Sequence, residues 1–230
     1  MGTASSWATW NRADQELHME SLAKMLGAVT QKLDAHGIRH IIGYGTLLGL
    51  YRDKALLWGD NDVDICIDGT SLTLEYVNDI KNEYSNAMSS MFYSHEEIST
   101  LLKDGGVAPI KSMRVSPRDE NGKKLCKTAF VDLYMFFPYA NAQYLRYGTQ
   151  SYVRCRTSTF DTKRFATSMG EFNIPKNTEQ FLEDEYGWDW NVPQLGKIDR
   201  TYGFKRARIK EVGDLYWNFT TNEFDSAKFG

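Results

Sequence analysis

The N-terminal part of the chain has a helical pattern followed by a strand and a turn. Between residues 13 and 36, apolar side chains recur at spacings of three and four, which places them on one face of an α-helix. Gly37 can end that helix in a left-handed conformation. The predicted elements that follow are a buried strand at 38–44, a turn at Gly45 and a short helix at 46–51 that Thr46 caps.

Further along the chain, a period of two replaces the helical period. Between residues 62 and 68, three aspartates alternate with Val63, Ile65 and Ile67, which predicts a strand with one acidic and one apolar face. The other predicted elements are a helix at 72–84, strands at 107–115 and 125–137 around a turn at 117–122, a hairpin within 144–157, and a helix from Thr178 to Tyr186 that stops at Gly187. No pattern is evident after residue 199. These elements predict an α+β fold, in which helices pack on a mixed β-sheet.

Length and charge narrow the class of protein. The 230 residues fit one large domain, and 42% apolar with 25% charged residues is ordinary for a soluble globular protein. The net charge is −3, which argues against bulk nucleic acid as a partner, because binding along many phosphates requires a basic face. A small anionic substrate remains compatible, since it needs only a few local cations.

Targeting signals are sparse. No run of about 18 apolar residues predicts a transmembrane helix, and the N-terminus lacks the apolar core of a signal peptide. We therefore expect a cytoplasmic protein, or one of a secretory organelle if an N-terminal anchor is missing from this chain. Met1, Gly2 and Ser6 match the myristoylation pattern, and an acylated Gly2 would give weak membrane association. The three scattered cysteines predict neither a disulfide framework nor a zinc site.

Asp60, Asp62 and Asp64 are the first candidates for chemistry. Alternate residues of an extended chain lie on one side, and crowded carboxylates repel each other unless a cation lies between them. Hard divalent cations such as Mg²⁺ or Mn²⁺ prefer oxygen ligands of this kind. A solvated strand face or turn is the alternative, because two aspartates at this spacing are common.

A glycine-rich segment, Gly43-Tyr44-Gly45-Thr46, precedes these acids by fewer than twenty residues. A strand, a glycine turn and a helix N-terminus present N–H groups to a phosphate, and Gly45 lets the backbone approach closely. A phosphate site beside a metal site is what phosphoryl transfer requires.

Asp132 is a third candidate carboxylate, since it stands in the otherwise apolar strand 129–137. An unpaired charge is costly to bury, so Asp132 needs a partner. That partner is either a metal ion shared with the other acids or a nearby lysine or arginine in a salt bridge.

Together these features resemble the nucleotidyltransferase fold, and longer segments resemble the LicD/fukutin family. Residues 43–52 (GYGTLLGLYR) and 58–64 (WGDNDVD) are similar to the family's G-T-L-L-G-x-x-R and W-D-D-D-I-D, although Gly59 and Asn61 replace aspartates. Residues 172–177 (FNIPKN) and 186–190 (YGWDW) are similar to its closing I-P-x-N and Y-G-x-x-W. The resemblance implies a single catalytic domain at 13–195, with a flexible tail at 1–12 and a C-terminal extension at 196–230.

The resemblance also implies roles for individual residues. Asp62 and Asp64 would hold Mg²⁺ or Mn²⁺ and Asp132 would complete the site, with two ions clamping a donor diphosphate. Asp132 could also take the proton of the attacking sugar hydroxyl, while Asp60 would lie outside the metal ligands. Donor phosphate would be bound by Gly43, Gly45, Thr46 and Arg52. An ion pair within the protein is the alternative role of Arg52.

Several other side chains have two interpretations. Lys111 and Arg114 lie on one predicted strand and point either to solvent, which is favoured, or to a cleft. Trp188 and Trp190 either belong to the core, which is favoured, or stack on a base or sugar. The histidines have neither metal-ligand spacing nor a nucleophile partner, and no role is assigned to them; they are His18, His36, His40 and His95.

Three functions fit this reading. A LicD-like phosphotransferase would move a phospho-alcohol, such as phosphocholine or ribitol phosphate, from a CDP-linked donor to a sugar or glycan acceptor and release CMP. A nucleotidyltransferase proper would use an NTP to modify a small molecule, a protein or RNA. A non-catalytic relative would only bind glycans or nucleotides, and the presence of all three acids argues against it.

Overall fold

The computed structural model describes residues 10–86, 92–109, 112–117, 129–139, 142–147, 152–156, 160–193 and 216–224. Its helices are α1 (Arg12–Ala35), α2 (Tyr44–Leu48), the π-helix η2 (Gly49–Asp53), the 3-10 helix η3 (Gly69–Ser71), α3 (Leu74–Glu83), α4 (His95–Asp104) and α5 (Thr178–Tyr186). Its strands are β1 (His40–Ile42), β2 (Asp62–Asp68), β3 (Tyr84–Asn86), β4 (Phe92–Tyr93), β5 (Val107–Pro109), β6 (Ser112–Pro117), β7 (Phe130–Tyr139), β8 (Ala142–Tyr147), β9 (Tyr152–Arg156), β10 (Thr162–Thr167), β11 (Gly170–Pro175), β12 (Tyr216–Asn218) and β13 (Glu223–Phe224).

A mixed sheet forms the centre of the molecule. Its strands follow the order β1-β2-β7-β6-β3, in which β2 and β7 are parallel and the other neighbours are antiparallel. The short β4 pairs with β6, and β8 continues from β7 and pairs with β9. The predicted α+β fold, a single domain with helices packed on a mixed sheet, is confirmed.

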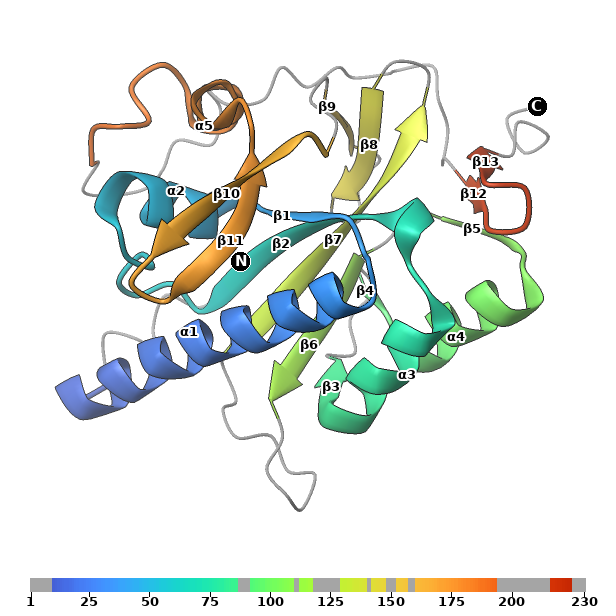
Figure 1. Ribbon diagram of the computed structural model, residues 1–230, viewed down its shortest axis with the longest axis horizontal. Helices are drawn as coiled ribbons and strands as arrows, with labels where there is room; N and C mark the ends of the chain where they lie inside the picture. The colour runs from blue at the N-terminus through green and yellow to red at the C-terminus, as the bar shows by residue number, and fades with distance from the viewer. Residues whose placement is uncertain are drawn as a thin grey trace.

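The core lies where α1 crosses the central strands (Figure 1). On α1, Leu22, Leu26 and Leu33 are completely buried, as the predicted helical face requires. The apolar residues of β2 and β7 are completely buried in the same cluster; they are Val63, Ile65, Ile67, Val131, Leu133 and Met135. Since side chains alternate along a strand, the aspartates of β2 and β7 lie on the other face of the sheet.

The N-terminal predictions hold in outline and fail in one detail. Asn11 caps α1 by accepting from the backbone N–H of Asp14, and Gly37 has a left-handed φ of 66°, as predicted. The strand predicted at 38–44 is shorter, because α2 already begins at Tyr44. The prediction that Thr46 caps this helix is wrong, since Gly43 occupies the N-cap position and Thr46 lies within the helix.

The middle and the C-terminal part of the chain differ more from expectation. The single strand predicted at 107–115 is two strands in different sheets, because β5 pairs with β12 and β6 pairs with β7. The hairpin within 144–157 is confirmed by β8 and β9, and the last predicted helix is confirmed by α5. Helix α4, the β10–β11 hairpin and strands β12 and β13 were not predicted. The turn at 118–122, Lys111, Gly2 and most of the 1–12 tail lie outside the described residues.

None of the helices in the described part of the chain combines the length and apolar character that crossing a membrane demands.

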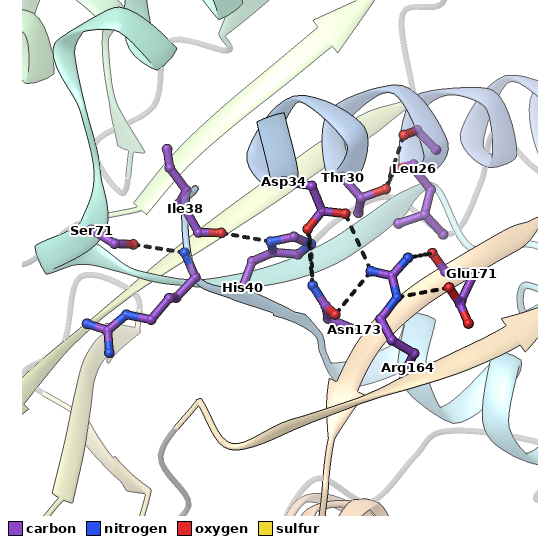
Figure 2. Close-up of polar contacts among 11 residues, drawn as sticks. Leu26, Thr30, Asp34, Ile38, His40, Ser71, Arg164, Glu171 and Asn173 are labelled. Atoms are coloured by element: carbon purple, nitrogen blue, oxygen red, sulfur yellow. Dashed lines mark hydrogen bonds and ion pairs between the residues drawn. The ribbon is translucent and has the colours of Figure 1, made fainter. Parts of the chain in front are cut away.

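A polar cluster joins the end of α1 to β1 and the β10–β11 hairpin (Figure 2). Arg164 on β10 donates to Asp34 on α1 and to Asn173 and the carbonyl oxygen of Glu171 on β11. Buried His40 on β1 lies beside Asp34 and Asn173 (Figure 2), with its Nδ1 3.0 Å from the carbonyl oxygen of Ile38 and its Nε2 3.4 Å from Asn173 Nδ2. The carbonyl oxygen of Ile38 can only accept, so Nδ1 of His40 carries a proton. The Asn173 amide nitrogen can only donate, so Nε2 accepts from it and carries no proton. The His40 ring is therefore neutral.

His40 should therefore make stability depend on pH. Burial lowers the pKa of His40, against smaller opposing effects of the hydrogen bond to Ile38 and of Asp34. The contribution of neutral His40 to the free energy of unfolding is fully present above its pKa in the unfolded chain, about 6.5. It is lost as the pH falls from there through the lowered pKa of the folded protein, because the unfolded chain binds the proton more readily. Urea unfolding at pH 7.5 and 5.5 should show a smaller loss in His40→Gln than in the wild type. Equal losses in both proteins would refute this role.

Candidate active site

Asp62, Asp64 and Asp132 meet on one face of the central sheet. Asp64 on β2 and Asp132 on β7 are register partners in the parallel pair, and Asp62 lies two residues before Asp64 on the same face. One carboxylate oxygen of each residue lies within 4.8 Å of the others, which is close enough for a shared metal ion. Asp64 is only 8% exposed and Asp132 only 1%, so these two side chains do not belong to a solvated strand face.

The electrostatics of this cluster suit a divalent cation. Burial raises the pKa of Asp64 well above its usual value, and the negative charges of Asp62, Asp60 and Asp132 raise it further. A backbone hydrogen bond from Gly45 acts in the opposite direction. A positive ion among the carboxylates would relieve this repulsion, and Mg²⁺ and Mn²⁺ prefer oxygen ligands. The residues present therefore fit such an ion.

Arg114 on β6 also belongs to the cluster. It is the register partner of Asp132, and its Nε and Nη2 donate to the two oxygens of that carboxylate. Its Nη2 also lies 3.7 Å from Oδ2 of Asp62. The favoured prediction that Arg114 points to solvent is therefore wrong, and the salt-bridge alternative for Asp132 is observed. Burial raises the pKa of Asp132, while Arg114 opposes that rise.

The glycine-rich segment lies against the acids, as its spacing predicted. A Cβ atom on Gly45 would lie 3.0 Å from Oδ2 of Asp60 and 3.7 Å from Oδ2 of Asp64. A Cβ atom on Gly43 would lie 2.5 Å from the Sγ of buried Cys66 on β2. Glycine at both positions thus lets α2 approach β2 closely. The predicted binding of a donor phosphate by this segment stays a prediction, and the N–H of Gly45 already donates to Asp64.

Thr46 has a structural task beside the acids. Its side chain is buried, and its hydroxyl accepts from the backbone N–H of Asp64 at 2.8 Å. The carbonyl oxygen of Asp64 in turn accepts from the N–H of Gly43. Both backbone groups of Asp64 are therefore held by the glycine-rich segment, which positions its carboxylate.

Replacing Thr46 by valine should separate this hydrogen bond from packing. Valine has nearly the same shape but leaves the buried N–H of Asp64 without an acceptor, which typically costs about 1–3 kcal/mol. Thr46→Ser keeps the hydroxyl and is the matched control, so it should lose less stability. Denaturant unfolding of the two variants measures the difference. If serine is the more damaging change, the methyl group rather than the hydroxyl is what matters.

Arg52, a predicted phosphate ligand, forms hydrogen bonds with other residues of the protein. Its Nε and Nη2 donate to the two carboxylate oxygens of Asp53 at 2.7 Å each, and Nη1 donates to the carbonyl oxygen of Trp190 at 3.3 Å. The alternative prediction of an ion pair within the protein is therefore observed. This contact joins η2 to the turn after α5.

The two tryptophans near the end of the family-like region behave differently. Trp190 packs against the core, with its ring 6.0 Å from that of Tyr51. Trp188 is 79% exposed, so the prediction that it belongs to the core is wrong. Trp188 is thus accessible for stacking on a ligand, which stays a prediction.

The fold and the site together define a class of protein. A mixed sheet that carries a D-x-D pair on one strand, a further aspartate on the adjacent parallel strand and a glycine-rich turn beside them is the arrangement of nucleotidyltransferase-fold enzymes. A family model described as LicD/FKTN/FKRP, nucleotidyltransferase domain, matches residues 37–177, and the chain belongs to this family. Members of the family are generally transferases, associated with the transfer of phosphoryl-alcohol groups. No curated protein matches the chain.

Proposed function

We propose that this protein transfers a phospho-alcohol, such as phosphocholine or ribitol phosphate, from a CDP-linked donor to a sugar or glycan acceptor in a reaction that depends on Mg²⁺ or Mn²⁺. Family membership supports the reaction class. The observation that carries the metal dependence is the meeting of Asp62, Asp64 and Asp132 within 4.8 Å, where burial and mutual repulsion raise the pKa of Asp64.

In this proposal the acceptor hydroxyl attacks the phosphorus that bears the alcohol. A new P–O bond forms to the acceptor, the P–O bond to CMP breaks so that CMP leaves, and the hydroxyl proton is released to the solvent. Asp62 and Asp64 would hold the metal ion, with Asp132 beside them. When bound, such an ion would neutralise the donor diphosphate and lower the pKa of the hydroxyl.

The protein's own residues contribute positioning. Gly43 and Thr46 hold both backbone groups of Asp64, so its carboxylate is fixed before a substrate arrives. Since charge stabilisation is strongest from groups that need no reorganisation, this favours a preorganised site. Both oxygens of Asp132 accept from Arg114, which favours a structural role of Asp132 in the cluster over that of a general base.

Donor preference tests this function against the alternative of NTP use. CMP release from CDP-choline and CDP-ribitol, with Mg²⁺ or Mn²⁺ and with EDTA as control, should be slow without an acceptor and should require the metal. Consumption of an NTP with release of pyrophosphate, and no turnover of either CDP-alcohol, would instead indicate a nucleotidyltransferase. Metal-dependent release of CMP would leave only the acceptor to be found.

A further inference from the structure

Arg114 is a positive charge built into the acidic cluster. Three carboxylates surround the site, and Arg114 lies within ion-pair distance of both Asp132 and Asp62. Its two hydrogen bonds to Asp132 use both oxygens of that carboxylate. The oxygens that a second metal ion would need from Asp132 are thus directed at a guanidinium group.

Two aromatic rings contact the guanidinium group of Arg114. The carbon of its guanidinium lies 4.6 Å from the ring centre of Phe92 on β4 and 4.7 Å from that of Phe130 on β7. Phe92 pairs with Ser112 and Phe130 with Asp62, so both rings are set by strand register next to Arg114. The cation–π contacts with two rings and the bidentate ion pair with Asp132 therefore fix the orientation of the guanidinium group.

The side chain of Arg114 is nevertheless 22% exposed. A guanidinium group has five N–H donors, and the contacts to Asp132 use two of its three nitrogens. Nη1 donates to neither oxygen of Asp132.

We propose that Arg114 is a positioning residue that takes the place of a second cation, so that the site holds a single divalent ion between Asp62 and Asp64. This rests on the proposed metal-dependent function. A second divalent ion at Asp132 would lie next to the guanidinium that already binds both carboxylate oxygens, and it would be repelled by the charge of that group. The sequence resemblance implied two ions, and the geometry points to one ion and one arginine.

Counting bound Mn²⁺ by electron paramagnetic resonance tests this proposal without any turnover. The wild-type protein should bind one Mn²⁺ per chain at the site. Arg114→Met removes the charge and both hydrogen bonds of the guanidinium to Asp132, and leaves that of the Tyr134 hydroxyl, so a second, spin-coupled Mn²⁺ should bind. Arg114→Lys keeps the charge and should remain at one. Arg164→Met is the matched control, because Arg164 pairs with Asp34 and Glu171 rather than with the cluster.

The outcomes separate the two proposals. Two spin-coupled ions in the wild type would overturn the role of Arg114 while leaving the metal-dependent function intact, and this holds even if Arg114→Met does not fold. One ion of unchanged affinity in a folded Arg114→Met would overturn it as well. No Mn²⁺ bound to the wild type, together with no release of CMP, would refute the metal-dependent function itself.

Discussion

Replacing Asp64 by asparagine should abolish most metal-dependent release of CMP, lowering kcat by roughly 10²–10³-fold or more, the loss typical of a group that stabilises transition-state charge. Asparagine has the same shape, and the backbone bonds of residue 64 to Thr46 and Gly43 can remain. The change removes one negative charge from the cluster that would hold the proposed cation. Initial rates of CMP release at saturating Mg²⁺ or Mn²⁺, measured for the variant and the wild type, give the factor.

The same substitution should make the metal-free protein more stable. The folded state raises the pKa of Asp64, through burial and then the neighbouring carboxylates, so it binds the proton more tightly than the unfolded chain. Stability of the metal-free wild type therefore falls as the pH rises from the ordinary aspartate pKa of about 3.9 through the raised folded value. Asp64→Asn lacks this loss, so its midpoint of thermal unfolding in EDTA should exceed that of the wild type at pH 7.

Asp68→Asn provides the matched control for both measurements. Asp68 lies on the same strand and face and is also buried, but it forms an ion pair with Arg39 and accepts from the N–H and the hydroxyl of Thr70. Losing its charge should destabilise the protein by about 1–3 kcal/mol and leave turnover nearly unchanged. If both substitutions destabilise the metal-free protein, repulsion at Asp64 is not the dominant effect there. If Asp64→Asn retains turnover, Asp64 is not a metal ligand.

The acidic site could be predicted from the sequence because its residues break a strand pattern. The aspartates at alternate positions 62, 64 and 68 of β2, and the one among the apolar residues of β7, each imply a charge that needs a partner. Arg114 gives the same signal, since it stands between the buried Met113 and Val115. Its partner could not be identified, because the choice between cleft and solvent depends on the register of β6 against β7.

Several of the missed strands lack a hydrophobic period. The missed helix α4 does have one, since Ile98, Leu101 and Leu102 follow the capping box of Ser94 and Glu97 at helical spacings, and this signal could have identified it. Strand β10 is mostly exposed on both faces, so its residues do not alternate between apolar and polar. Strands β5, β12 and β13 have only two or three residues, too few to show a period. The pairing of β5 with β12 depends on contacts between residues about 110 positions apart in the sequence, as between Ala108 and Trp217, which local patterns do not contain.

A close approach of backbone atoms explains Gly49, the third glycine of the family-like segment 43–52. Its φ of −61° is ordinary for any residue, so conformational freedom is not the reason for glycine. A Cβ atom at this position would lie 2.6 Å from the carbonyl oxygen of Ala55 and 2.9 Å from the backbone nitrogen of Leu57. The loop after η2 thus folds directly onto Gly49, and it continues to Asp60, whose N–H donates to the carbonyl oxygen of Leu57.

Gly49→Ala should therefore destabilise the protein by about 1–3 kcal/mol, the usual cost of overpacking, because backbone atoms must move to admit the methyl group. Helix propensity alone predicts the opposite sign, a gain of up to about 1 kcal/mol. Gly27→Ala on α1 is the matched control for helix propensity, because a Cβ atom placed there meets no atom of another element within 4 Å. This substitution should therefore raise the stability of the protein. Thermal unfolding distinguishes the two variants, because the midpoint temperature shifts by about 2–4 °C per kcal/mol for a chain of this size. A stabilising Gly49→Ala would show that the loop yields easily and does not hold the acids in place.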